Sequence, residues 1–267
     1  MSVGSAEVAE SARGTGAGDH GGSVGTFARL RRDAPWWLLP VTVVVVLGGF
    51  IVYSLWAATT GIGEAPGTPY LSPLYSPGWL AGHLPVAPGL LCILVPIAFR
   101  STCYYYRKAY HRSFFWDPPA CAIPELRHGT YRGETAFPLI LNNLHRFALY
   151  GAIVYIPILG FDAVNAFSLD GHLYLGLGTA IMAVNVVLLA GYTFSCHSFR
   201  HMVGGNIDCY SCVRFGAQRH SAWKAVTRIN IFHPTWAWVS LFSVWAVDLY
   251  IRMLHAGWFT DPHIWLR

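Results

Sequence analysis

Long apolar segments constrain this chain more than any other feature of its sequence. Residues 36–58, WWLLPVTVVVVLGGFIVYSLWAA, contain no charged side chain. Since about 20 helical residues cross the hydrocarbon core of a bilayer, this segment is long enough to span a membrane. We therefore predict an all-α integral membrane protein, a bundle of five transmembrane helices. The other four predicted helices lie at about 84–105, 137–160, 173–199 and 232–256.

The composition agrees with lipid as the main solvent of the chain. It is 54% hydrophobic and only 12% charged, whereas soluble domains carry about 25% charged residues. The net charge of +5 comes from basic residues between the apolar segments, which indicates membrane topology and not nucleic acid binding. Residues 1–34 are small, polar and rich in glycine, so we expect a disordered tail ahead of an anchor domain in 35–267.

The distribution of Lys and Arg predicts the orientation. Fourteen of the 18 basic residues lie in the tail and in the loops near 106–136 and 200–231, and none lies in the loops near 59–83 and 161–172. Because basic loops remain in the cytoplasm, we predict a multi-pass protein of the cell inner (plasma) membrane. Its N-terminus is predicted in the cytoplasm and its C-terminus outside.

A cluster of cysteine and histidine residues follows the fourth predicted helix. His197 and His201 are four residues apart and share one face of a helix, while Cys209 and Cys212 have the CxxC spacing that suits a single metal centre. A glycine pair between the two motifs permits the chain to turn back. The cytoplasm is reducing, so we expect no lasting disulfide here. The predicted metal ligands are His197, His201, Cys209 and Cys212.

The ligand types leave the identity of the metal open. Two thiolates and two imidazoles suit a tetrahedral zinc ion, and they also suit a Rieske-type [2Fe–2S] cluster, in which two histidines replace two cysteines on one iron. Cys196 is predicted to be a core thiol, because it lies about 100° around the helix from His197. The sequence does not decide whether Cys196, His145 or His233 replaces one of the predicted ligands.

Polar residues at the inner ends of the predicted helices are candidates for binding a quinone. Polar groups at membrane depth are costly, and imidazole, guanidinium and indole groups donate hydrogen bonds that quinone carbonyls accept. The predicted quinone-binding residues are His145, Arg146, His233, Trp236 and Arg100. The alternative is that the arginines reach lipid phosphates while His145 pairs with a backbone carbonyl. At the opposite side, Asp248 and Arg252 are predicted to form a solvated salt bridge.

The chain resembles the membrane-anchor subunit of actinobacterial succinate dehydrogenases, on three motifs. These are SCHSFRHMVGGNIDCYSC at 195–212, NNLHRF and FHPTWAW. The resemblance implies that a flavoprotein and an iron–sulfur subunit dock on the cytoplasmic face. It further implies that the chain passes electrons from succinate oxidation to a quinone, with menaquinone expected. No Gly-rich dinucleotide fingerprint is present, so the flavin belongs to a partner.

Two alternatives remain open beside the cluster-containing anchor. Related five-helix anchors bind two haems b through four histidines, and His145 with another inner histidine could ligate one haem b. The first predicted helix has no histidine, which argues against a pair of haems. A transporter or channel with structural zinc is the second alternative, although the helices lack the paired acidic residues of a transport pathway. The sequence leaves open whether the complex forms a higher-order oligomer.

Overall fold

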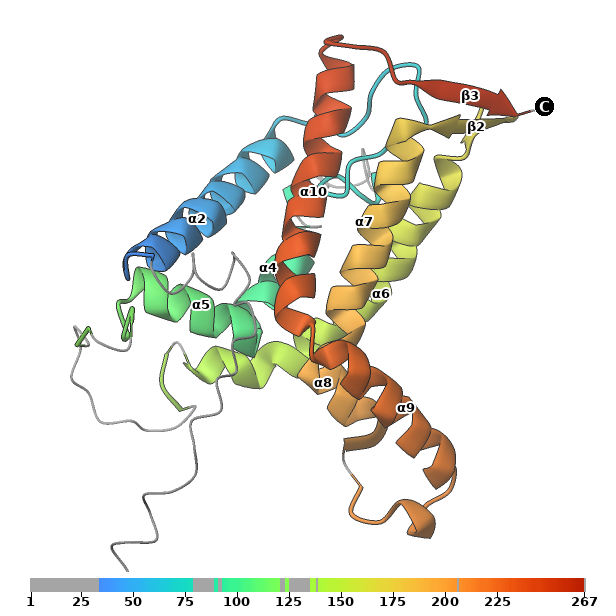
Figure 1. Ribbon diagram of the computed structural model, residues 1–267. Helices are drawn as coiled ribbons and strands as arrows, with labels where there is room; N and C mark the ends of the chain where they lie inside the picture. Colours follow the sequence, from blue (N-terminus) through green and yellow to red (C-terminus); the bar gives the residue numbers. More distant parts are fainter. Residues whose placement is uncertain are drawn as a thin grey trace, which may run out of the picture.

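Four helices of the computed structural model are long and apolar enough to cross a membrane. The structure describes residues 34–78, 89–90, 93–120, 123–124, 135–137, 139–205 and 207–266, and within them the four spans are α2, the unit formed by η3 and α6, α7, and α10. Helices α6, α7 and α10 run side by side, and α2 lies at an angle to them (Figure 1). The bounds are α2 Leu38–Thr59, η3 Leu139–Leu144, α6 His145–Asn165, α7 Leu177–Phe194 and α10 His233–His255.

The second predicted helix, 84–105, is interrupted. Helix α4 (Leu94–Thr102) ends at Cys103, whose backbone is extended (φ −66°, ψ 131°), and α5 (Tyr104–Phe114) begins directly after it. In Figure 1, α5 runs across the bundle below α2. Residues 84–88 and 91–92 of the predicted helix lie outside the described residues. The number of five spanning helices therefore stays a prediction, as do the orientation of the termini and the disordered tail.

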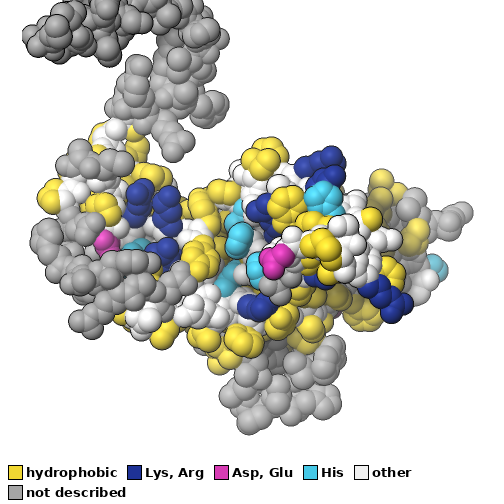
Figure 2. All heavy atoms as spheres, turned by 90° about the horizontal axis from the view of Figure 1, so that it is seen from below, with side chains coloured by type: hydrophobic (Ala, Val, Ile, Leu, Met, Phe, Trp, Pro, Cys, Tyr) yellow, Lys and Arg dark blue, Asp and Glu magenta, His cyan; other side chains and the backbone are white. Residues whose placement is uncertain are grey.

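The regions predicted as basic loops contain further helices. The loop near 106–136 includes most of α5, and the loop near 200–231 includes α9 (Gly216–Asn230). Between α7 and α9 lie α8 (His197–Arg200), η4 (His201–Gly205) and η5 (Tyr210–Cys212). Viewed from the α9 end of the molecule, Lys, Arg and His side chains gather on the surface (Figure 2). Hydropathy distinguishes membrane segments from polar ones, so it does not predict the helices that form within the polar loops.

A small antiparallel sheet covers the opposite end of the bundle, which is called the sheet end below. Strand β2 (His172–Gly176) lies between β1 (Ser168–Leu169) and β3 (His263–Leu266). The prediction that the fourth helix begins at 173 is wrong for this stretch. A turn at Asp170 and Gly171, both with positive φ, reverses the chain, and residues 173–176 pair with β3 before α7 begins.

The salt bridge between Asp248 and Arg252 is buried, not solvated as predicted. The Asp248 carboxylate is 0% exposed, and it accepts a hydrogen bond from Arg252 Nε at 2.7 Å. The loop after α2 folds over α10, so that Ser72 also donates to Asp248, and Tyr53 donates from α2 at 2.5 Å. A buried carboxylate is stable only when charge and hydrogen bonds compensate it, and here both do.

A second buried carboxylate joins the sheet to the bundle. Asp261 accepts hydrogen bonds from the hydroxyl groups of Tyr70 at 2.6 Å, Tyr174 at 2.9 Å and Tyr250. The backbone N–H of Gly178, in the first turn of α7, donates to the same carboxylate at 3.1 Å. One side chain thus connects the loop after α2, strand β2, α7 and α10.

We expect Asp261→Asn to lower the free energy of unfolding by about 2 kcal/mol, because hydrogen bonds to a charged acceptor contribute more than those to a neutral one. Thermal unfolding of the purified protein in detergent at neutral pH measures this. The control is Asp170→Asn, an exposed residue in a turn that asparagine tolerates. Equal unfolding temperatures for the two variants would contradict the assignment.

The effect of Asp261→Asn on stability should depend on pH. Burial by itself raises the pKa of Asp261, but hydrogen bonds from Tyr250, Tyr70 and Tyr174 outweigh it and hold the pKa below the usual 3.8. A carboxyl group whose pKa is lowered by folding stabilises the protein above its unfolded pKa and loses this effect as the pH falls. The stability difference between wild type and Asp261→Asn should therefore be full at neutral pH and shrink below pH 3.8.

Candidate functional site

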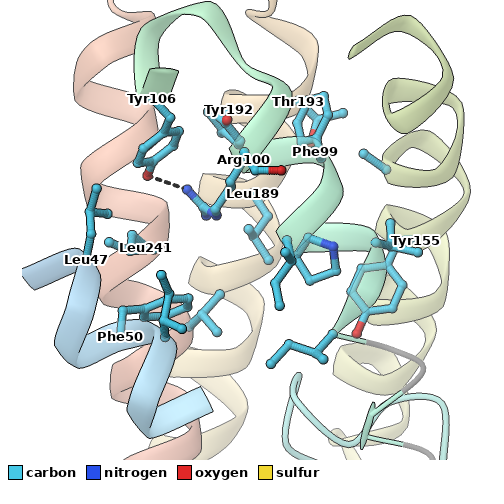
Figure 3. Close-up of a pocket in the computed structure, with 18 of the residues that line it drawn as sticks. Leu47, Phe50, Phe99, Arg100, Tyr106, Tyr155, Leu189, Tyr192, Thr193 and Leu241 are labelled. Atoms are coloured by element: carbon cyan, nitrogen blue, oxygen red, sulfur yellow. Dashed lines mark hydrogen bonds between the residues drawn. The ribbon is translucent and has the colours of Figure 1, made fainter. Parts of the chain in front are cut away.

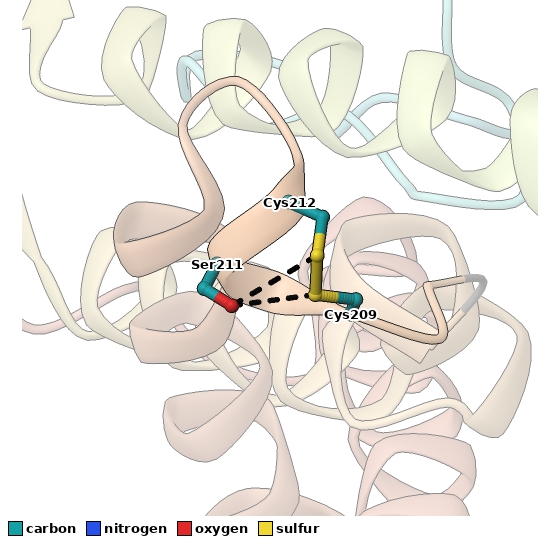
Figure 4. The surroundings of a disulfide bond; sticks show 3 residues. All are labelled: Cys209, Ser211 and Cys212. Atoms are coloured by element: carbon teal, nitrogen blue, oxygen red, sulfur yellow. Dashed lines mark hydrogen bonds between the residues drawn. A yellow bond between two sulfur atoms is a disulfide. The ribbon is translucent and has the colours of Figure 1, made fainter.

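Cys209 and Cys212 form a disulfide, so the expectation of two free thiols is wrong. Both lie in the turn that contains η5, and Ser211 between them contacts each sulfur atom (Figure 4). The CxxC spacing suits a disulfide as well as a metal, since the two Cα atoms are 5.3 Å apart. Sulfur atoms joined in this way do not act as thiolate ligands.

The structure does not bring the four predicted ligands together. His197 is exposed at the start of α8, and His201 begins η4, where its ring lies against Gly205. Within the part of the chain that the structure describes, no group of three or more His, Cys, Asp or Glu side chains is arranged around one metal ion.

Two cysteines and two histidines converge instead in the core, as two pairs. His145 Nε2 lies 3.0 Å from Cys196 Sγ, and His233 Nε2 lies 3.6 Å from Cys103 Sγ. All four residues are buried. The pairs are neighbours, because both cysteines belong to one cluster of core residues, and the rings stacked on the two imidazoles, Phe99 and Tyr192, contact each other at a centroid distance of 5.2 Å. We call these four residues the core cluster.

Each member of the core cluster lies where a helix begins. Cys103 and Cys196 have extended backbones and precede α5 and α8, while His145 and His233 are the first residues of α6 and α10. An extended residue between two helices turns its side chain out of the helical repeat, here into the bundle. The N-terminal ends of helices also favour negative charge, such as that of a thiolate.

Hydroxyl groups orient both imidazoles. His145 Nδ1 lies 2.9 Å from Thr102 Oγ1, and His233 Nδ1 lies 2.8 Å from Ser195 Oγ. Each ring therefore has one nitrogen held by a hydroxyl and the other directed at a sulfur atom. Metal-binding histidines characteristically have this arrangement, because the outer hydrogen bond fixes the ring and its tautomer.

An aromatic ring stacks on each of the two imidazoles. Phe99 stacks on His145 with a centroid distance of 4.9 Å, and Tyr192 stacks on His233 at 5.0 Å. The Tyr192 hydroxyl is buried beside Cys103 and has no hydrogen-bond partner among the described residues. An orphaned hydroxyl next to a sulfur atom is suited to donate to a thiolate that carries a metal.

The environment of Cys196 keeps its thiol protonated in the absence of a metal. Burial raises the pKa of Cys196 to about 11, and the nearby Cys103 contributes in the same direction. The backbone N–H of Ser198 donates to the Cys196 sulfur at 3.3 Å, which favours the thiolate. A metal would therefore have to displace a proton from this group.

An apolar cavity of about 340 Å³ lies against the other side of the two aromatic rings. Residues of α2, α4, α5, α6, α7, α10 and the loop after α2 line it, and Phe99 and Tyr192 form part of its wall (Figure 3). Arg100 is the charged residue of this lining. A cavity with predominantly hydrophobic walls and a few polar groups is typical of sites for small apolar molecules.

Among the five residues predicted to bind quinone, Arg100 lines this cavity. Its guanidinium donates to Tyr106 Oη, to the carbonyl of Ala237 and to Ser240 Oγ, at 2.5, 3.0 and 2.9 Å. It also lies over the Tyr192 ring, 4.7 Å from the centroid. These contacts fix the charge at the edge of the cavity.

The other four predicted quinone residues lie elsewhere. His145 and His233 belong to the core cluster, behind Phe99 and Tyr192. Arg146 is exposed on α6. Trp236 packs against Gly191, and its indole nitrogen is buried without a hydrogen-bond partner among the described residues.

Sequence reasoning missed Cys103 altogether. No neighbouring ligand residue marks this cysteine in the sequence. The available signal was weak: Cys103 and Cys196 each precede a polar, basic segment after an apolar one. Such a boundary is where a helix can break, but the sequence does not say that the two breaks meet.

The disulfide gives a direct chemical prediction. In protein purified without reductant and then denatured, a maleimide should label neither Cys209 nor Cys212, and reduction before labelling should expose both. Peptide mass spectrometry measures the labels. As a control, Cys209→Ser should leave Cys212 labelled without reductant. Full labelling of both in the unreduced wild type would show that the pair is free.

Two comparisons with known proteins point to the same kind of protein. The family model for actinobacterial succinate dehydrogenase subunit SdhC matches residues 38–257. A solved structure titled "Mycobacterium smegmatis Sdh1 complex in the apo form" contains a chain that is 34% identical, with a TM-score of 0.79. The alignment covers 88% of this chain and 94% of that one. No curated protein matches significantly.

The family match confirms the resemblance seen in the sequence, and the four apolar helices confirm a membrane protein. The chain therefore belongs to the actinobacterial family of succinate dehydrogenase subunit SdhC: it is the multi-pass membrane anchor that associates with the other dehydrogenase subunits in the plasma membrane.

Proposed function

We propose that this anchor passes electrons from the iron–sulfur subunit to a quinone through a [2Fe–2S] cluster held by Cys103, Cys196, His145 and His233. The observation that carries the proposal is the convergence of these two thiols and two imidazoles at buried helix starts. This set has the composition of a Rieske-type centre, so the predicted cofactor is kept and the predicted ligands are replaced.

The donor arrangement favours a binuclear cluster over a single zinc ion. A tetrahedral zinc site needs four donors around one point, whereas a two-iron cluster takes two ligands on each iron. The described residues offer no group of three donors around one point. Four donors spread over two neighbouring His–Cys contacts agree better with the binuclear case, in which His145 and His233 would bind one iron and Cys103 and Cys196 the other.

The packing around the imidazoles argues against the haem b alternative. A haem held by His145 and His233 would lie between their rings. The faces of these rings are stacked on Phe99 and Tyr192, which are also in contact with each other at a centroid distance of 5.2 Å. The nitrogen atoms are directed at hydroxyl groups and sulfur atoms, and not at a shared plane.

The protein's own residues supply the environment for electron transfer. When bound, such a cluster accepts one electron at a time, and neutral imidazole ligands raise its potential above that of an all-cysteine cluster. Phe99 and Tyr192 exclude water from the ligands and form the wall shared with the apolar cavity. We propose that the quinone occupies this cavity, with menaquinone expected from the resemblance.

Arg100 is the residue best placed to orient the quinone headgroup. Its hydrogen bonds to Tyr106 on α5 and to Ala237 and Ser240 on α10 account for three of the five N–H donors of a guanidinium. A remaining donor can bind a carbonyl oxygen of the quinone, and the fixed positive charge stabilises the oxygen as electrons arrive. The aromatic and aliphatic walls bind the ring and the isoprenoid tail.

We expect Cys196→Ser to abolish the paramagnetic signal of the anchor's reduced cluster in the purified complex, because a ligand is lost. The signals of the partner subunits should persist, and so should succinate oxidation with artificial dyes. Electron paramagnetic resonance with iron analysis measures this. The matched control is Cys209→Ser, which should keep the signal. The reverse pattern would restore the ligands predicted from the CxxC motif, and no iron beyond that of the partners would end the proposal.

The quinone site is tested by filling the cavity. Ile156→Trp adds a large ring to the cavity wall on α6, and we expect at least about a tenfold loss of kcat/KM for quinone, since bound ligand and indole compete for the same volume. Val154→Trp, on the same helix but 63% exposed, is the control and should retain quinone reduction. If both variants behave as wild type in steady-state assays, the quinone binds elsewhere.

A further inference from the structure

Two carboxylates lie near the sheet end of the spanning helices, and they differ in how far ion pairs and hydrogen bonds compensate their negative charge. Asp248 forms an ion pair with Arg252 and accepts hydrogen bonds from two hydroxyl groups, so its charge is neutralised. Asp162 lies one turn from the end of α6, half-buried, and accepts a hydrogen bond from Ser76. Among the described residues, it forms no ion pair. An uncompensated acid at this depth is costly and calls for a function.

A small cavity adjoins Asp162. It measures about 10 Å³, which is close to the minimum that one water molecule requires. Its walls facing Asp162 come from the loop after α2, from α7 and from α10, and they contain no other charged side chain. The residues of these walls are Leu71, Pro73, Met182, Asn185, Val186 and Val247. Asn185, 3% exposed, supplies the polar side chain that lines this cavity together with Asp162. A water molecule here would bridge the two.

Polar groups continue from Asn185 towards the quinone cavity. Asn185 Oδ1 accepts a hydrogen bond from Ser243 Oγ at 2.7 Å, and Ser243 also donates to the carbonyl of Ser240 at 3.0 Å. Ser240 Oγ accepts from Arg100, which lines the larger cavity. The two cavities also share Pro73 and Leu159 as wall residues, so they are separated by a single layer of side chains.

We propose that Asp162 is a proton carrier that supplies the quinone cavity from the aqueous phase at the sheet end. Reduction of a quinone to a quinol takes two electrons and two protons. The electrons come from succinate through the partner subunits, and each proton is added to a carbonyl oxygen. Asp162 releases a proton towards the cavity through bridging water and is reprotonated through its own solvent-accessible side, since it is only half-buried. This inference rests on the proposed quinone reduction, and it adds the side from which the protons come.

The test uses the whole complex in liposomes that contain quinone and a trapped pH indicator. Succinate added outside reaches only complexes whose dehydrogenase subunits face outward, so the sheet end faces the lumen in the predicted orientation. Valinomycin and potassium remove the membrane potential. We expect the lumen to become alkaline during turnover, by two protons per succinate oxidised. Asp162→Asn should abolish this uptake and slow quinone reduction by about 100-fold, as for loss of an acid–base group.

Asp170→Asn is the matched control, because it makes the same change at an exposed turn of the sheet end and should retain uptake. Asn185→Leu, which removes the polar side chain that lines the small cavity together with Asp162, should also reduce uptake. Dye reduction by succinate verifies assembly of each variant. Wild-type quinone reduction without lumenal alkalinisation would overturn the proton route and leave the proposed function intact. Unchanged uptake in Asp162→Asn would overturn it too, and absence of quinone reduction in the wild type would instead refute the proposed function.

Discussion

Thiol and imidazole groups meet in this bundle where the helices α5, α6, α8 and α10 begin. Polar groups buried among apolar side chains are costly unless they find partners, so each helix must begin at the position that brings its cysteine or histidine to the others. This requirement is consistent with α4 ending directly before the extended Cys103, and with α7 ending two residues before the extended Cys196, in place of continuing as long helices. The packing of Phe99 and Tyr192 depends on the same positions, because each ring stacks on one of the imidazoles.

The cavity follows from this arrangement. The break at Cys103 turns α5 across the bundle, so its aromatic residues cover a space between α2, α4 and α6 that a continuous helix would leave open to lipid. Arg100, in the last turn of α4, is held by two hydrogen bonds to α10 and one to Tyr106 on α5, and it brings positive charge to the edge of that space. The proposed cluster and quinone sites can therefore share a wall without sharing water.

The acidic groups near the sheet end differ in how far counter-charge and hydrogen bonds compensate them, and this difference separates two structural carboxylates from the proposed proton carrier. Asp261 and Asp248 accept several hydrogen bonds each and fasten loops and strands to the helices. Asp162 has a hydroxyl neighbour and a small cavity in place of a counter-ion. Proton movement needs a group that can exist in both charge states at modest cost, and a carboxylate locked by an arginine does not meet this need.

Hydropathy alone determined that the chain is a membrane protein, and it placed α2 and α10 to within a few residues, because transfer of apolar side chains into lipid is a property of the segment itself. The motifs also indicated the family that comparison then confirmed. Local spacing led to His197, His201, Cys209 and Cys212, since i, i+4 and CxxC patterns are visible within a few residues. Only the tertiary structure decided that Cys103, His145, Cys196 and His233 meet, because their contacts join residues 51 and 130 positions apart, and packing, not sequence proximity, brings such groups together.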